Sequence, residues 1–308
     1  MIKHLRIKAR AQRAVRLLIN SFFLLFSNKK NIIVTNVSMI VVKDKVKHCN
    51  IGDDLNYYII EELSKKKIFN YCDVIYPNKQ NPVYMCIGSI IDWMTTSNSI
   101  IWGSGVRDNN NPLPAHPLKV LAVRGPLTRD YLLSNGIECP EVYGDPALLL
   151  PHIYPPPINI YKRFSMGIIL HKNDLNNDIV HKFILEKNQE VTIIDIMHYD
   201  NWRDVINHIL ECKIIISSSL HGLILSDAYD IPNFWIKFSD KTFDGSFKYL
   251  DYFASVCRQT KAPIEINNIE NLAEILNNPP EFQHIHFNPS PLLSVCPFLS
   301  QSKYSNGK

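Results

Sequence analysis

The sequence has 308 residues, of which 46% are hydrophobic and 20% charged, with a formal net charge of +4. This composition is typical of a soluble globular chain that folds as one large domain or two smaller ones. Seven cysteines occur without a CxxC pair, so no metal site and no disulfide framework are predicted, and a reducing cytoplasm suits them best. No apolar run has the length of a membrane-spanning helix.

Positive charge is concentrated in residues 1–30, which contain eight Lys and Arg side chains and no acid. The rest of the chain has 25 basic and 29 acidic residues, and this acidic body argues against a nucleic-acid partner. The apolar stretch Ala14–Phe26 is too short to span a bilayer and lacks a signal-peptide cleavage site. We interpret residues 1–30 as an amphipathic arm lying on an anionic membrane surface. A helix packed on the protein is the alternative.

Residues 31–150 are predicted to form a first Rossmann-like domain. Residues 32–42 indicate one or two strands, and residues 84–89 and 100–106 each indicate a strand that enters a glycine loop. Such loops let the backbone approach a ligand closely. Neither fits G-x-G-x-x-G or a P-loop, so no dinucleotide or nucleoside triphosphate site is predicted. The candidate binding residues in these two loops are Gly88, Ser89, Gly103 and Ser104.

Charged residues in the same half are further candidates. Asp53 lies at the start of a helix predicted for residues 55–65, where it either caps the helix or acts as a general base. Arg124 stands at the carboxyl end of the strand predicted for 120–123, where a guanidinium can bind a carboxylate or phosphate bidentately. Asp145, in a turn after another predicted strand, either makes an Asx turn or orients a neighbour.

The proline-rich residues 151–160 are predicted to be a stiff linker. After it, strands and helices alternate as in a doubly wound parallel sheet, which predicts a second Rossmann-like domain over 161–280 and a strap or tail over 281–308. Two such domains facing across a cleft are a GT-B-like α/β architecture. The predicted strands are 166–170, 191–196, 214–216, 234–238 and 264–266; the predicted helices are 178–187, 202–212, one from Leu220, 247–256 and 269–276.

The strand at 214–216 runs into what we call the serine–histidine turn, which consists of Ser217, Ser218, Ser219, Leu220 and His221. Open α/β sheets bind ligands just beyond the carboxyl ends of their strands. The first amides of the following helix favour an anion, and His221 could donate a hydrogen bond or a proton to a leaving oxygen. The alternative is that Ser219 only caps the helix and His221 only packs. His171 and Lys237 end neighbouring strands at the same edge.

Five short blocks are distinctive in combination: IGDDLN at 51–56, IWGSGV at 101–106, VRGPLT at 123–128, GDPALL at 144–149 and SSSLHGLI at 217–224. In this order they resemble the polysaccharide pyruvyl transferase family, and most closely the ketal pyruvyltransferases of bacterial exopolysaccharide assembly. The resemblance extends over about residues 32–240, leaving out the basic arm and the tail.

The resemblance implies transfer of a pyruvyl group from phosphoenolpyruvate to a sugar, forming a ketal and releasing phosphate without a cofactor. The sugar would belong to an exopolysaccharide, capsule or lipopolysaccharide repeat unit carried by a lipid, which places the enzyme in the cytoplasm or on the inner face of the plasma membrane. The serine–histidine turn would bind the donor, with His221 as acid or phosphate donor. Arg124 would clamp the carboxylate, Asp53 would be the base, and His171 and Lys237 would assist.

One position departs from the family pattern. Much of the family has S-x-R-L-H where this chain has Ser219 in place of the arginine. The departure shifts anion binding to Arg124, Lys237 or Arg129, and leaves a changed donor or reduced activity open. Two other functions fit the same pattern: a GT-B glycosyltransferase that uses a nucleotide sugar, and a catalytically silent assembly factor at the membrane.

Overall fold

The computed structural model describes residues 14–15, 17–22, 32–34, 40–42, 45–47, 50–71, 74, 82–187, 189–239 and 245–299. The chain divides into two compact units, one of residues 1–146 with 290–308 and the other of residues 147–289. The predicted linker therefore lies in the second unit and begins as a helix, α5 (Leu150–Ile153). Pro151 is accommodated because the first turn of a helix needs no amide donor.

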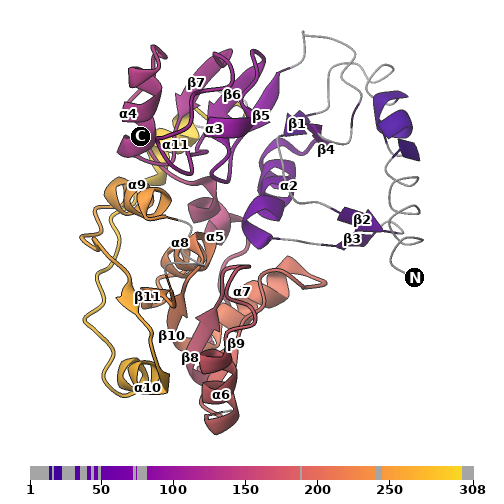
Figure 1. Ribbon diagram of the computed structural model, residues 1–308. Helices are drawn as coiled ribbons and strands as arrows, with labels where there is room; N and C mark the ends of the chain where they lie inside the picture. Colours follow the sequence, from indigo (N-terminus) through magenta and orange to yellow (C-terminus); the bar gives the residue numbers. More distant parts are fainter. Residues whose placement is uncertain are drawn as a thin grey trace. The chain divides into compact units, whose positions relative to one another are not determined.

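The first unit contains a five-stranded parallel sheet, β4-β1-β5-β6-β7 (Figure 1). The chain passes from its first strand to one side of the sheet and then returns to build the other side, so the direction of winding switches between β1 and β5. The strands are β1 (Ile32–Val34), β4 (Ile68–Asn70), β5 (Val83–Met85), β6 (Ser99–Trp102) and β7 (Lys119–Ala122), with a separate antiparallel pair of β2 (Ile40–Val42) and β3 (Lys45–Lys47).

The helices of this unit are α2 (Ile51–Ser64), α3 (Ile91–Met94), α4 (Pro126–Ser134) and, at the boundary, α11 (Pro289–Ser294). Helix α2 starts four residues before its predicted start, because the side chain of Asn50 caps it by accepting from the Gly52 amide at 3.2 Å. Asp53 is therefore a first-turn residue and not the cap. The C-terminal strap is fixed to β6, since the Trp102 indole donates to the Leu292 carbonyl at 3.0 Å.

A predicted strand from Val142 into the Gly144 turn is wrong. The structure has one bridge there, between Val123 and Tyr143, followed by the 3₁₀ helix η2 (Pro146–Leu149). The proline at the start of η2 has no amide to donate to a strand partner, so the pairing ends before it.

The second unit contains a parallel sheet in the order β12-β11-β10-β8-β9, with the predicted alternation of strands and helices (Figure 1). Asparagine side chains cap three of its helices, which explains why these helices begin where the sequence predicts. The strands are β8 (Phe164–Ile169), β9 (Val191–Ile193), β10 (Cys212–Ser217), β11 (Asn233–Lys237) and β12 (Ile264–Glu265). The helices are α6 (Asp178–Glu186), α7 (Trp202–Leu210), α8 (Leu220–Ala228), α9 (Phe247–Ser255) and α10 (Ile269–Asn277).

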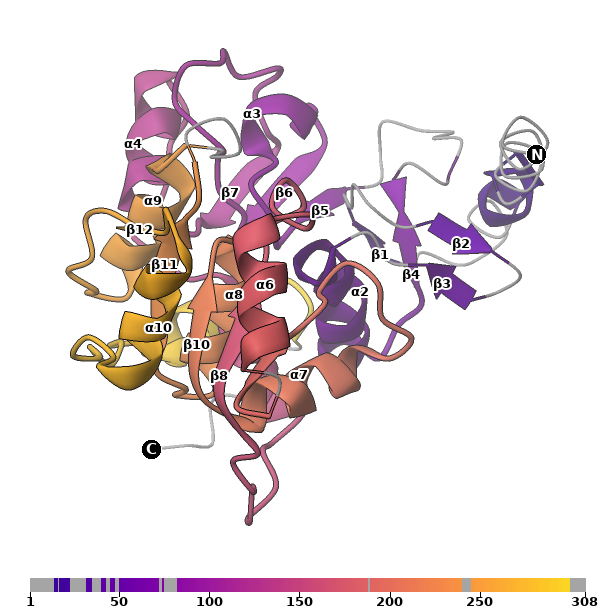
Figure 2. The same ribbon diagram turned by 60° about the horizontal axis from the view of Figure 1, so that its bottom comes forward.

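Helices cover the two faces of this sheet. Helices α7 and α8 pack on β10, while α6 packs on β9 and against α10 (Figure 2). Connections between parallel strands are right-handed, so the direction in which a connection crosses the sheet decides which face its helix covers. The connection from β8 to β9 runs in the opposite direction along the sheet to the connections from β9 to β10 and from β10 to β11, so α6 lies on the other face from α7 and α8. Alternating residues of β10 serve the two faces: Ile216 belongs to the core shared with Phe183 and Leu272, and Ser217 points to α8.

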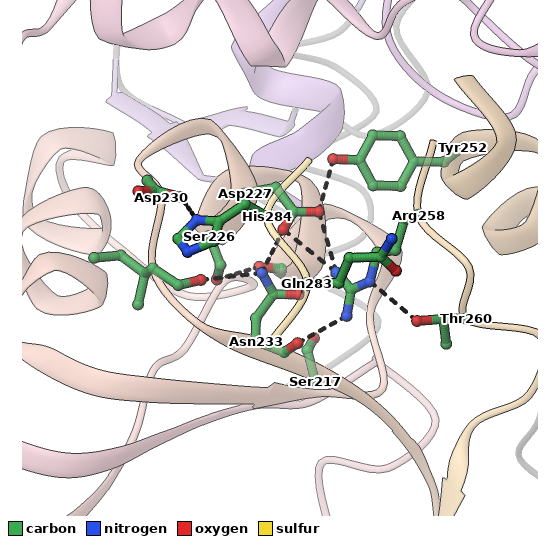
Figure 3. A network of polar contacts seen from close by, with 12 residues as sticks. Ser217, Ser226, Asp227, Asp230, Asn233, Tyr252, Arg258, Thr260, Gln283 and His284 are labelled. Atoms are coloured by element: carbon green, nitrogen blue, oxygen red, sulfur yellow. Dashed lines mark hydrogen bonds and ion pairs between the residues drawn. The ribbon is translucent and has the colours of Figure 1, made fainter. Parts of the chain in front are cut away.

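A buried polar network fixes the far end of α8 (Figure 3). Asp227 of α8 lies 3.2 Å from Arg258 Nη1 and accepts from Tyr252 Oη at 2.8 Å and from Asn233 Nδ2 at 2.6 Å. Burial raises the pKa of Asp227, and the Arg258 guanidinium opposes that rise. Because Arg258 also donates to the Asn233 carbonyl at 2.7 Å, the network joins α8, β11 and the end of α9.

Breaking this network should destabilise the protein strongly. Arg258→Met leaves the Asp227 carboxylate buried without its cation, so the free energy of unfolding should fall by ~3–5 kcal/mol in chemical denaturation. The exposed Lys261→Met is the matched control and should change it by less than ~0.5 kcal/mol. Adding Asp227→Asn removes the stranded charge and should recover part of the loss; no recovery would contradict this explanation.

Candidate functional site

The second sheet has its switch in winding direction between β8 and β10. The two strands are neighbours, with Ile169 opposite Ser217 at their carboxyl ends. The chain leaves β8 toward β9 on one side and leaves β10 toward β11 on the other. Ligands of open α/β sheets bind where two such connections diverge. The serine–histidine turn follows β10 and therefore stands at the position that the topology favours.

Helix α8 approaches the sheet closely at Gly222. A Cβ atom added there would lie 2.3 Å from Ser217 Oγ and 2.8 Å from Ile169 Cγ2, both closer than real Cβ contacts. A glycine is thus required for the first turn of α8 to lie directly on the ends of β8 and β10. This contact sets the position of the neighbouring His221.

The serines hold the turn in shape. The Ser217 hydroxyl, fully buried, accepts from the Ser219 amide at 3.0 Å and lies 3.1 Å from the Ile169 carbonyl. Ser218 Oγ accepts from the His171 amide at 2.9 Å, which joins the turn to the loop after β8. Two of the three serines thus have structural hydrogen bonds, and Ser219 has none from its side chain to the helix although it occupies the N-cap position.

Tyr249 is a residue that sequence reasoning missed. Its hydroxyl donates to the Ser218 carbonyl at 2.7 Å, in a buried position on α9, and its ring stacks on Trp235 with centroids 4.4 Å apart. The ammonium of Lys248, itself only 7% exposed, lies 5.3 Å from the same ring. No signal in the sequence connects α9 to the turn, because 31 residues separate Tyr249 from Ser218.

The first turn of α8 is suited to an anion. Backbone amides at a helix start point outward and the helix dipole adds partial positive charge there. Ser219 and Leu220 are each 5% exposed and His221 is 8% exposed, with its Nε2 atom buried. A ligand that reaches these groups would be shielded from water, where hydrogen bonds to an anion are strong.

Two predicted residues lie at the same sheet edge. His171 is half-buried, and its Nδ1 accepts from the Asn173 amide at 3.4 Å. Lys237 ends β11 and its Nζ lies 3.0 Å from Glu265 of β12. His171 joins the turn through its backbone, and Lys237 is held toward the outer strand.

The predicted residues of the first unit gather beyond the ends of β5, β6 and β7. Ser104 Oγ donates to the Gly88 carbonyl at 2.7 Å, and Asp53 Oδ1 would lie 3.2 Å from a Cβ at Gly88. Gly88 and Gly103 have φ of +109° and +96°, a region that favours glycine. The side chain of Asn56 bonds both backbone groups of Ile87, so α2 is fixed to this loop.

Arg124 is almost entirely buried, with 1% of its surface exposed. It donates through Nη1 to Ser89 Oγ at 2.6 Å and through Nη2 to the Val106 carbonyl at 2.8 Å. Gly105 makes room for it, since a Cβ there would lie 2.4 Å from Cζ. The guanidinium thus holds the loops after β5 and β6 together. Arg129 lies 3.2 Å from Glu141 and donates to the Cys139 carbonyl.

Metal and thiol chemistry find little support among the residues that the structure describes. In those ranges no group of three or more His, Cys, Asp or Glu side chains gathers in a geometry that could hold a metal ion. Burial raises the pKa of the Cys86 thiol, next to the Gly88 loop, well above its ordinary value, and Cys296 and Asp145 add to the rise. A protonated thiol is a poor nucleophile.

The chain is similar to a protein family, to a viral protein and to a solved structure. A family model described as polysaccharide pyruvyl transferase matches residues 50–240, a range that includes Asp53, Arg124 and the serine–histidine turn. An uncharacterised protein of Acanthamoeba polyphaga mimivirus is 28% identical over 248 residues, which are 75% of this chain and 82% of that protein. A solved structure of an uncharacterised protein from Klebsiella pneumoniae covers 80% of this chain and 98% of its own, with a TM-score of 0.42 and 16% identity.

The close contact at Gly222 can be tested by its cost. Gly222→Ala should lower the free energy of unfolding by ~1–3 kcal/mol, because the added methyl overlaps Ser217 and Ile169. Ser217→Ala removes the nearer of the two obstacles. The double variant should therefore be less destabilised than the sum of the single variants in denaturant titrations. Simple additivity would show that the methyl group is accommodated elsewhere.

Proposed function

The chain belongs to the polysaccharide pyruvyl transferase family, and on this premise we propose that it transfers a pyruvyl group from phosphoenolpyruvate to a sugar hydroxyl pair. The product is a ketal on a polysaccharide repeat unit, and phosphate is released. The observation that supports this most is the serine–histidine turn at the winding switch of the second sheet, within the matched residues.

Phosphoenolpyruvate binds at the start of α8 in this proposal. The outward amides of the first helical turn and the Ser219 hydroxyl take the phosphate, as helix N-termini commonly do. Tyr249 keeps the peptide after Ser218 oriented through its 2.7 Å hydrogen bond. Lys248 supplies the nearby positive charge, since its ammonium lies over the ring of that tyrosine.

His221 is the proposed acid. It delivers a proton to the methylene carbon C3 of the donor, so that C2 becomes an oxocarbenium-like centre that a sugar hydroxyl attacks. The C2–O bond to phosphate breaks with its electron pair on the leaving oxygen, and a second hydroxyl closes the ketal. The first hydroxyl gives its proton to a base of the site as it bonds to C2, and the proton of the second hydroxyl leaves with the phosphate. The anionic groups are stabilised by amides already oriented by the fold.

The acceptor is proposed to be a lipid-linked oligosaccharide that contacts the first unit at Asp53 and the Gly88 and Gly103 loops. A carboxylate beside glycine loops can bind sugar hydroxyls while the backbone comes close. The arrangement of the two units across a cleft, as in GT-B enzymes, stays a prediction.

One assay separates the proposal from its rivals. The full-length protein is given phosphoenolpyruvate or nucleotide sugars together with a panel of galactosides and other glycosides, and phosphate release and acceptor mass are followed. A pyruvyl-sized mass gain with phosphate release supports the proposal. Release of a nucleoside diphosphate would favour a glycosyltransferase. No turnover with any donor across the panel would favour a silent assembly factor.

His221→Ala should reduce turnover by ~10²-fold or more, because general acid catalysis typically contributes that much. The matched control is His284→Ala, an exposed histidine paired with Asp230 at the surface (Figure 3), which should keep its rate. Both variants should fold, as monitored by circular dichroism. Near-normal turnover by His221→Ala would make this histidine a packing residue only.

The N-terminal helix is proposed to bind an anionic membrane surface, on the inner face of the plasma membrane where lipid-linked acceptors and phosphoenolpyruvate meet. Residues 14–15 and 17–22 are helical, and Val15, Leu18, Ile19 and Phe22 are 54%, 64%, 48% and 61% exposed. Their spacing puts them on one helix face, and the surrounding arm is basic. Within the described ranges, every helix is too short or too polar to span a bilayer.

Liposome flotation tests this surface. Deleting residues 1–30, or introducing Leu18→Ser with Phe22→Ser, should weaken binding to phosphatidylglycerol-containing vesicles at least tenfold while turnover on soluble acceptors is retained. Leu185→Ser, an 80% exposed leucine on α6, is the matched control. Equal binding by all variants would refute a membrane-binding arm.

A further inference from the structure

The loop after β8, residues 170–177, forms the other side of the winding switch. It leaves the sheet beside the serine–histidine turn and contacts it, since the His171 amide donates to Ser218 Oγ at 2.9 Å. The two connections then run to opposite sides of the sheet. The loop that contains Asp174 is therefore joined through its backbone to the turn at which the topology favours ligand binding.

Asp174 in this loop is buried, with only 6% of its surface exposed. Its Oδ1 atom is enclosed and has no hydrogen-bond partner among the described residues. A buried carboxylate oxygen without a donor costs folding free energy, so such groups are rare in proteins and are found where a ligand completes them.

An aspartate in a loop often caps a helix or closes a turn, but other groups do both in this loop. The N-cap of α6 is Asn177, whose side chain accepts from the Ile179 and Val180 amides at 3.0 and 3.3 Å. The turn that contains Asp174 closes through its backbone, because the Asp174 amide donates to the His171 carbonyl at 2.8 Å. The carboxylate therefore caps no helix and closes no turn.

The charge of the donor indicates which group Asp174 would contact. Phosphoenolpyruvate carries a phosphate and a carboxylate, which repel another carboxylate, whereas a sugar hydroxyl donates a hydrogen bond to it. The attacking hydroxyl must also lose its proton as the bond to C2 forms. A carboxylate that has an oxygen without a donor, in a loop that contacts the donor-binding turn, suits that step.

We propose that Asp174 accepts the proton of the sugar hydroxyl that attacks C2 of phosphoenolpyruvate, a role that rests on the proposed function. The O–H bond of the sugar breaks as its oxygen forms the bond to C2, and the proton passes to the carboxylate. The proton that His221 delivers to C3 is thereby balanced by the one that Asp174 takes up. The second unit then holds both the acid and the base of the first addition.

The test compares Asp174→Asn with Asp178→Asn, an exposed aspartate four residues along the chain. Transfer from phosphoenolpyruvate to the best glycoside of the panel is measured together with phosphoenolpyruvate binding by calorimetry and with the unfolding temperature. Asp174→Asn should lose ~10²-fold or more in turnover, bind phosphoenolpyruvate within twofold of the unmodified protein and unfold at the same or a higher temperature. Asp178→Asn should match the unmodified protein in all three.

Each contrary outcome is distinct. Turnover by Asp174→Asn within threefold of the unmodified protein would remove Asp174 from the chemistry and leave the proposed function standing. A loss of turnover with a lowered unfolding temperature would show a structural role. A greater loss from Asp53→Asn with little from Asp174→Asn would assign the base to the first unit. An unmodified protein that transfers nothing from phosphoenolpyruvate would overturn the proposed function and this role with it.

Discussion

The contact between the first turn of α8 and the ends of β8 and β10 is the constraint on which the second unit depends. A helix can lie this close to two strands only where a glycine faces them, and Gly222 meets Ser217 and Ile169. Once α8 is seated, its outward amides point beyond the carboxyl edge of the sheet and His221 is carried with them. The position of these amides and of His221 is therefore a consequence of packing, and the buried network at Asp227 holds the other end of the same helix.

The buried polar groups of this unit divide into two kinds. Asp227 is surrounded by Arg258, Asn233 and Tyr252, and its hydrogen bonds account for its presence in the interior. Asp174 is buried to a similar degree and has an oxygen that no described group satisfies. The first kind stabilises the fold, whereas the second lowers stability unless a ligand completes it. Proteins commonly tolerate such a cost at functional sites, where the binding of a substrate restores the missing interaction.

In the first unit, glycines and buried polar side chains position the loops at the sheet edge. Gly88 and Gly103 adopt positive φ, and Arg124 and Ser104 join the loops after β5 and β6 from within. Asp53 lies against the Gly88 loop because α2 is fixed there through Asn56. These contacts position the two loops and the Asp53 carboxylate within the first unit.

From residue 161 on, the sequence predicted the strands and helices of the second unit to within three residues, since apolar strands of β-branched residues alternate with asparagine-capped amphipathic helices. It also singled out the serine–histidine turn, because local signals of strand, small polar loop and helix coincide there. Four features emerge only from the folded chain: the Asn50 cap of α2, the burial of Arg124 against Ser89, the hydrogen bond from Tyr249 to Ser218, and the enclosed Oδ1 of Asp174. Such features depend on contacts between segments far apart in the chain, or on a side chain having no partner nearby in space. Neither kind of feature produces a periodic pattern or a fixed spacing in the sequence, so sequence reasoning cannot detect it.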